Sequence, residues 1–268
     1  MIDVSEFAGF DLWLDPEARS VSSNAGFSFN PVTRFQQDMR PVLRTPEAAQ
    51  DGVPWYEIFY MNEAPEAARV DLERLRLTYG PVLLPPGAIA GEFVKTSGHY
   101  HPDMPGVTLS YPEIYTGLYG RLLLFLQRRD RQATDTPLDC AIIELLPGVT
   151  VTVPPDYAHV LINPSEEPAL MAGLYGADFK PDYREVAAHR GLAWYVMRGE
   201  SDYEVAANPA YVNPPPLRHI TGLTGTIFEP PVGDRDVPVW TAFRRNPDRY
   251  AFLSQSRPAA GYFARWLP

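Results

Sequence analysis

Short apolar runs, broken by proline and glycine, dominate the chain from about residue 75 onward. They are LRLTYGPVLL, GEFVKTSGHYH, EIYTGL, RLLLFLQ, CAIIELL, VTVTV, HVLIN and ALMAGLYG. Turn-forming pairs such as Pro86-Gly87 and Pro147-Gly148 separate them, and each pair can reverse the chain into the next run. Many short strands joined by tight turns are typical of an all-β sandwich or barrel.

The pattern changes on both sides of these strands. Residues 181–192, PDYREVAAHRGL, place a proline near a first turn and a glycine as a stop, which predicts a short helix lying against the barrel. The end of the chain is rich in proline and aromatic residues, and we expect the aromatics to pack on the barrel or on a partner subunit. The pattern predicts an N-terminal arm (1–36), a central β domain (37–199) and a C-terminal extension (200–268).

Composition indicates a folded, acidic protein. Of the 268 residues 45% are apolar, and 29 prolines disfavour long helices. The net charge is −10 and the only lysines are Lys95 and Lys180, so no nucleic-acid surface is expected. No apolar stretch reaches the ~18 residues of a membrane span, and the first residues do not resemble a signal peptide, which favours the cytoplasm. Cys140 lies in an apolar run and predicts a buried structural thiol.

Two of the five histidines lie one residue apart, in the segment TSGHYH. Alternate side chains of a strand share a face, so His99 and His101 should point the same way and Tyr100 the opposite way. An isolated pair of this kind more often consists of exposed surface residues without a specific role than of two metal ligands. Its meaning therefore depends on what other residues join it.

A carboxylate and a third histidine are candidates to join the pair. Glu113 and Tyr115 share one face of the following strand, and a hairpin over residues 99–115 would bring Glu113 to both histidines. His159 comes later, in the segment VPPDYAHVLIN. Three imidazoles and one carboxylate form a mixed nitrogen and oxygen site suited to Fe(II), Mn(II), Ni(II) or Zn(II). With all four residues present, a metal site is favoured over exposed surface histidines without a role.

The spacing of these residues resembles that of the cupin family. Five residues separate Gly148 from Pro154, four separate Pro154 from His159 and three separate His159 from Asn163, as in the second cupin motif. More narrowly, four segments together resemble the cupin-type glucose-6-phosphate isomerases: GEFVKTSGHYH, YPEIYTGLYGRLLLFLQ, VPPDYAHVLINPSEEPAL and GLYGADFKPDYREVAAHRGL. The resemblance covers roughly residues 37–198 and implies a cupin fold, a double-stranded β-helix shaped like a jelly roll, with a few short helices.

The same resemblance implies roles for individual residues. His99, His101, Glu113 and His159 would hold one divalent metal ion per subunit, with Fe(II) expected ahead of Mn(II), Ni(II) or Zn(II). Glu113 would also be the catalytic base, with Tyr175 as a second catalytic group. Thr96, Gly98, Tyr115 and Tyr183 would bind the substrate, with the Thr-Ser-Gly turn holding its phosphate. The implied protein is a homodimer that interconverts glucose 6-phosphate and fructose 6-phosphate, by proton or by hydride transfer, in glycolysis and gluconeogenesis.

Three departures keep other functions open. The gap between His101 and Glu113 is longer than in compact members of the family, Pro181 stands where many carry a histidine, and Val82 stands where some carry a phosphate-binding threonine. If the inserted segment displaced Glu113, Asp103 would be the nearest substitute. The alternatives are a related cupin metalloenzyme, such as an epimerase or oxygenase for another small polar or phosphorylated molecule, and a sugar-phosphate-binding cupin without turnover.

Overall fold

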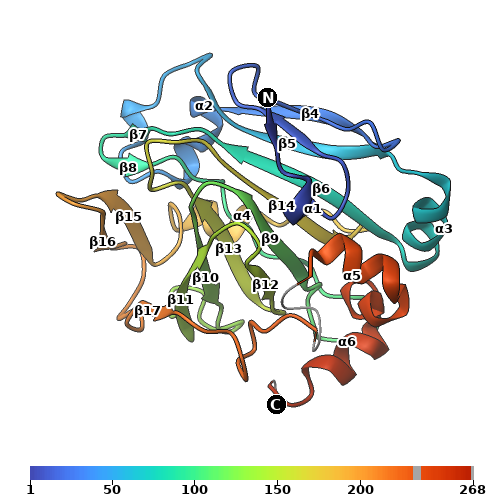
Figure 1. The fold of residues 1–268 in the computed structure, drawn as a ribbon. Helices are drawn as coiled ribbons and strands as arrows, with labels where there is room; N and C mark the ends of the chain where they lie inside the picture. The colour runs from blue at the N-terminus through green and yellow to red at the C-terminus, as the bar shows by residue number, and fades with distance from the viewer. Residues whose placement is uncertain (232–236, 267–268) are drawn as a thin grey trace.

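The computed structural model describes residues 1–231 and 237–266, and strands dominate this part of the chain (Figure 1). The largest sheet has the order β12 (Thr150–Val153), β9 (Glu113–Tyr119), β14 (Ala169–Gly176), β6 (Leu77–Leu84), β5 (Pro54–Glu63) and β4 (Ser28–Phe35). A second sheet has the order β13 (Tyr157–Ile162), β10 (Leu122–Arg128), β11 (Asp139–Leu145) and β17 (Arg218–Ile220). Pairing is antiparallel except between β11 and β17. The all-β prediction is confirmed.

Smaller elements surround these two sheets. One small sheet contains β16 (Tyr203–Ala207), β15 (Trp194–Arg198), β8 (Glu92–Phe93) and β7 (Ala88–Ile89), and another contains β1 (Ile2–Asp3), β2 (Trp13–Asp15) and β3 (Ser20–Ser22). The helices are α1 (Ser5–Ala8), α2 (Gln36–Met39), α3 (Glu66–Leu75), α4 (Arg184–Ala188), α5 (Val239–Arg245) and α6 (Ser256–Phe263), with 3-10 turns at Arg40–Val42, Pro46–Ala48 and Pro247–Leu253. Helix α4 is the predicted short helix, and it buries Val186. No helix in the described ranges has the length and apolarity to cross a membrane.

The largest sheet has a pocket on one face and an apolar core on the other, as β6 illustrates. Thr78, Gly80 and Val82 line the pocket, whereas Tyr79 and Leu83 are buried in the core on the opposite side. Successive side chains of a strand point to opposite faces, and because both faces are covered the strand is apolar almost throughout. Strands β9 and β14 alternate in the same way.

The N-terminal segment and helix α5 pack together on the outer face of this sheet. The Trp240 ring of α5 lies 5.5 Å from the Tyr79 ring of β6 and 5.2 Å from the Phe27 ring. The Thr241 hydroxyl donates to the Gly9 carbonyl, so the N-terminal segment and α5 are in direct contact (Figure 1). The division into an arm, a barrel and an extension stays a prediction, and residues 232–236 and 267–268 of the extension lie outside the described residues.

The hairpin expected over residues 99–115 forms only over residues 102–111, and the prediction that it joins the histidine pair to the Glu113 strand is wrong. His99 instead forms a bridge with His159 of β13, and Tyr100 forms one with Asp182. Strand β9, which carries Glu113, pairs with β12 and β14. The histidine pair and Glu113 therefore approach each other from separate parts of the barrel.

The inserted segment between His101 and Glu113 closes on itself, which explains this topology. The Met104 N–H donates to the Leu109 carbonyl at 2.9 Å, and the Tyr111 N–H donates to the Pro102 carbonyl at 3.1 Å. Met104 is 1% exposed and packs in the outer core. The insertion forms backbone hydrogen bonds within itself and buries one apolar side chain, so it does not displace β9.

Candidate metal centre

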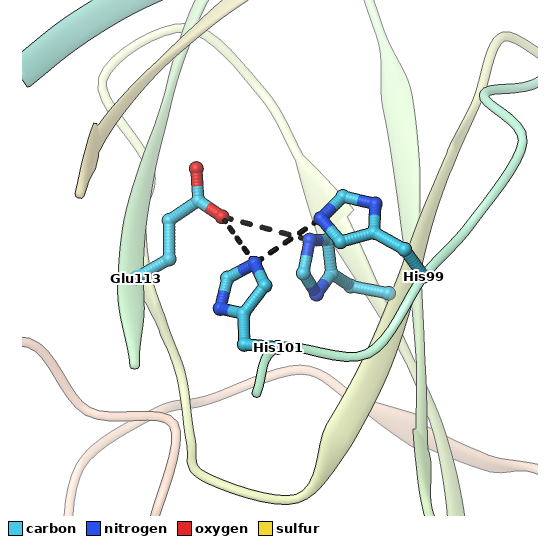
Figure 2. Close-up of side chains that lie close together, drawn as sticks. His99, His101 and Glu113 are labelled. Atoms are coloured by element: carbon cyan, nitrogen blue, oxygen red, sulfur yellow. Dashed lines mark hydrogen bonds and ion pairs between the residues drawn. The ribbon is translucent and has the colours of Figure 1, made fainter. Parts of the chain in front are cut away.

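The four predicted ligands converge inside the barrel. One ligand atom from each of His99, His101, Glu113 and His159 lies within 4.8 Å of the others. His99 and His101 come from the extended segment before the insertion, Glu113 begins β9, and His159 lies in the middle of β13. Figure 2 shows the Glu113 carboxylate facing the imidazoles. The site is therefore built between the two larger sheets.

The insertion orients one of these imidazoles. His101 Nδ1 lies 2.8 Å from the Tyr111 carbonyl, which can only accept, so Nδ1 carries the proton and Nε2 keeps its lone pair. That Nε2 atom lies 3.5 Å from Glu113 Oε2 and 3.1 Å from His99 Nε2. A histidine whose second nitrogen donates to a carbonyl is the usual arrangement around a metal.

Burial keeps the three imidazoles uncharged. It lowers the pKa of His159 to about 4, and it lowers the pKa of His99 and His101 well below the ordinary value, with neighbouring imidazoles adding to the effect. Burial also raises the pKa of Glu113 well above its ordinary value, although the Tyr115 hydroxyl opposes this. Neutral imidazoles are the form that binds metals.

Two buried atoms in the cluster, both ring nitrogens of His159, have no hydrogen-bond partner in the described chain. His159 Nε2 is fully enclosed and faces Glu113 Oε2 at 3.5 Å. Buried polar atoms are nearly always satisfied, and an exception points to a missing ion or water. Three imidazole nitrogens and one carboxylate oxygen directed at one point fit a divalent metal ion.

A pocket of about 330 Å³ opens beside the cluster, and every predicted substrate residue lines it. Thr96 and Gly98 form part of its wall, and the Thr96 hydroxyl oxygen accepts from the Leu161 N–H at 3.0 Å. Tyr115, Tyr175 and Tyr183 form other parts of the wall. The structure brings these residues together with the four ligands, and their individual roles stay predictions.

Several lining residues were not predicted from the sequence. Tyr56 and Tyr60 of β5 line the pocket, and Tyr56 approaches the Thr-Ser-Gly turn, with its hydroxyl 3.4 Å from Ser97 Oγ. The signal for them was the alternation in PWYEIFYM. Gly173 of β14 was also missed, and a Cβ atom there would lie 2.6 Å from Glu113 Oε1.

Asp103 is not at the site, so the substitute considered for Glu113 is not needed. Both carboxylate oxygens of Asp103 accept from the Arg131 guanidinium, at 2.5 and 2.8 Å. His189 and His219 lie outside the cluster as well: His189 stacks on the Tyr211 ring, and His219 pairs with the Tyr203 hydroxyl. Cys140 is buried and unpaired with any other cysteine.

Gly98 should be needed for stability, because the backbone there has φ +73° and a Cβ would lie 2.5 Å from Val160 Cγ2. The left-handed conformation costs a residue with a Cβ roughly 1–2 kcal/mol, and overpacking adds about 1–3 kcal/mol. We expect Gly98→Ala to lower the free energy of unfolding by roughly 2–5 kcal/mol in urea titrations. Gly52→Ala is the matched control, since Gly52 has φ +74° but no atom near a Cβ. Equal losses in the two variants would contradict the steric part of this prediction.

An all-β barrel that directs three histidines and a glutamate into one pocket defines a cupin with a candidate metal site. Residues 33–211 match the model of the family described as glucose-6-phosphate isomerase (GPI). The chain belongs to this family.

Relatives and solved structures are similar over part of the chain. The glucose-6-phosphate isomerase of Pyrococcus abyssi is 31% identical over 135 residues, which is 50% of this chain and 65% of the relative. That of Thermococcus litoralis is 32% identical over 50% of this chain and 64% of the relative, so the match spans just under two thirds of these relatives. A cupin domain of an XRE-family transcriptional regulator from Enterobacter cloacae is 18% identical, with a TM-score of 0.26 over 38% of this chain and 82% of that one.

Proposed function

We propose that the protein is a metal-dependent aldose-ketose isomerase that interconverts glucose 6-phosphate and fructose 6-phosphate. The observation that carries the proposal is the cluster of His99, His101, Glu113 and His159, which opens into a pocket large enough for a small ligand. Membership of the family supports the choice of reaction and substrate. The retained carboxylate of Glu113 favours turnover over binding alone.

The residues of the pocket suit an isomerisation between neighbouring carbons. A divalent metal ion bound by the cluster would polarise the carbonyl and hydroxyl oxygens of the sugar. Glu113 would take the proton from C2 of glucose 6-phosphate and return it to C1, while the hydroxyl proton of O2 passes to O1. The family resemblance also leaves open that the hydrogen moves between the carbons as a hydride. Burial raises the pKa of Tyr115 and Tyr175 far above ordinary values, so both phenols stay neutral and can donate to sugar oxygens.

We propose Fe(II) as the resident ion, ahead of Mn(II), Ni(II) and Zn(II). The cluster offers three imidazole nitrogens and one carboxylate oxygen. Imidazole suits Fe, Ni and Zn, and the absence of thiolate among the four donors removes the strongest preference for Zn(II). On a six-coordinate ion these four ligands leave two positions for sugar oxygens.

Removal and replacement of the metal tests the isomerase proposal. We expect chelation to abolish conversion of fructose 6-phosphate to glucose 6-phosphate in a coupled assay, and at least one of Fe(II), Mn(II), Ni(II) or Zn(II) to restore it. Protein carried through the same steps without chelator is the control. Absence of turnover with all four ions would contradict the proposal, and calorimetry with a phosphosugar would then show whether the protein only binds.

Two lining residues favour a second candidate, a cupin metalloenzyme that acts on another small polar or phosphorylated molecule. Val82 and Pro181 both line the pocket, and neither side chain can donate a hydrogen bond, whereas the family resemblance implies a threonine and a histidine at these positions in some members. A panel of aldose and ketose phosphates in the same assay separates the candidates. Turnover of another substrate at a higher kcat/KM than fructose 6-phosphate would favour the second.

The proposal extends to a homodimer in the cytoplasm. Strand β4 is an edge strand of the largest sheet in the described chain, and Val32 on β4 and Tyr60 on the neighbouring β5 are exposed large apolar side chains. Edge strands with apolar neighbours are suited to pairing with another chain. Light scattering tests the dimer, and a mass of one chain would refute it. Cell fractionation tests the location, and recovery with membranes or outside the cell would refute it.

A further inference from the structure

An arginine outside the pocket lining points toward the pocket. Arg34 of β4 pairs with Tyr56 of β5 in antiparallel register. Residues directly opposite each other in such a pair project from the same face of the sheet. Because Tyr56 lines the pocket, the half-buried Arg34 side chain projects from the pocket face, at its outer rim.

The charge of Arg34 is not neutralised by an ion pair. Among the described residues no carboxylate lies within 4.0 Å of its guanidinium, whereas the next arginine along the chain, Arg40, pairs with Asp51 at 2.8 Å. Asp38 acts on Arg34 only at longer range, and its carboxylate accepts from the Phe35 N–H at 2.9 Å. Arg34 thus keeps a positive charge available for a ligand.

The neighbours of Arg34 are phenols of the pocket wall. Tyr56, Tyr183 and Tyr60 all interact with it electrostatically, and Arg34 lies near enough to the Tyr183 hydroxyl to oppose the effect of burial, which raises the pKa of Tyr183 to about 12. The Tyr56 hydroxyl lies 3.4 Å from Ser97 Oγ, in the Thr-Ser-Gly turn. Arg34 therefore stands beside the part of the wall where Tyr56 meets that turn.

Arg34 is the cationic side chain that the strand register places next to the pocket wall. Lysine and arginine are both missing from the described residues that line it. The protein as a whole has a net charge of −10, which disfavours an anionic substrate. A phosphate dianion is held most strongly by charge-assisted hydrogen bonds, and the planar guanidinium offers two parallel donors.

We propose that Arg34 binds the phosphate of the substrate and selects phosphorylated over unphosphorylated sugars. The inference rests on the proposed function and deepens it. Val82 also lies on this face, two strands over from β4 and two residues along, because Val82 pairs with Ile58 and Ile58 pairs with Val32. Arg34, on the edge strand β4, supplies the hydrogen-bond donors that the Val82 side chain on β6 lacks.

Calorimetry with sorbitol 6-phosphate and sorbitol tests the role of Arg34, because these polyols cannot be isomerised and report binding alone. We expect Arg34→Gln to weaken binding of sorbitol 6-phosphate by about 10- to 100-fold and to change binding of sorbitol by less than about twofold. Arg34→Lys should recover part of the lost affinity for sorbitol 6-phosphate, since lysine keeps the positive charge but lacks the two parallel donors of the guanidinium group. Arg40→Gln, at an exposed arginine of the adjoining turn, is the matched control and should bind as the wild type does. Circular dichroism checks that each variant is folded.

The outcomes separate this inference from the isomerase proposal. Wild-type affinity of Arg34→Gln for sorbitol 6-phosphate, or an equal loss for both polyols, would overturn the role of Arg34. A wild-type protein without preference for the phosphorylated polyol would overturn it as well. A selective loss in Arg34→Gln together with no conversion of fructose 6-phosphate would leave Arg34 as a phosphate ligand and remove only the isomerase assignment.

Discussion

Replacing His159 with alanine should yield a folded protein that no longer retains a divalent metal. His159 is the only member of the cluster that comes from β13, and its buried Nε2 faces the Glu113 carboxylate with no hydrogen-bond partner. Loss of a group that merely orients a ligand typically lowers metal affinity 10- to 100-fold, so loss of the ligand itself should cost more than about 100-fold. Metal analysis of the purified variant and competition with a chromogenic chelator measure the effect.

His219→Ala is the matched control for that experiment. His219 is an exposed histidine on β17 that contacts Tyr203 rather than the cluster, so its removal should leave the metal content unchanged. Removing the His159 imidazole also relieves the cost of an unsatisfied buried nitrogen in the metal-free protein, and the variant should therefore remain folded by circular dichroism. Near-stoichiometric metal in folded His159→Ala would refute the assignment of this residue as a ligand.

Features encoded within a few residues were predictable from the sequence. Strands β9 to β14 follow apolar runs bounded by proline and glycine turns, because two-residue alternation and turn chemistry act locally. The convergence of His99 and His101 is local as well, since it follows from the extended backbone around Tyr100. The alternation holds although His99 and Tyr100 make only isolated bridges instead of a continuous strand.

Strand pairing could not be obtained in the same way. The hairpin over 99–115 was the shortest connection between the histidine pair and Glu113, yet the insertion closes its own hydrogen bonds and leaves His99 to pair with His159. Pairing depends on loop closure and on contacts distant in sequence, which a local pattern does not contain. For the same reason Arg34 was overlooked: its place at the pocket follows only from the pairing of β4 with β5.

Changing Glu113 to glutamine should remove most of the turnover while leaving much of the metal in place. The amide keeps an oxygen that can bind a metal but cannot accept a proton from carbon, and a general base contributes about 10²- to 10⁴-fold to a rate. We expect kcat for fructose 6-phosphate to fall by about that factor, with a smaller change in KM. The measurement is steady-state kinetics at saturating metal, accompanied by metal analysis of the same preparation.

The matched control for Glu113→Gln is Glu204→Gln, because Glu204 is an exposed glutamate of β16 with no place in the pocket. Burial raises the pKa of Glu113, so the carboxylate is an effective base when it is ionised and a poor ligand when it is protonated. Metal analysis therefore distinguishes the two ways in which the variant could lose activity. A Glu113→Gln protein that holds its metal and turns over within tenfold of the wild type would show that Glu113 is not the base that takes the proton.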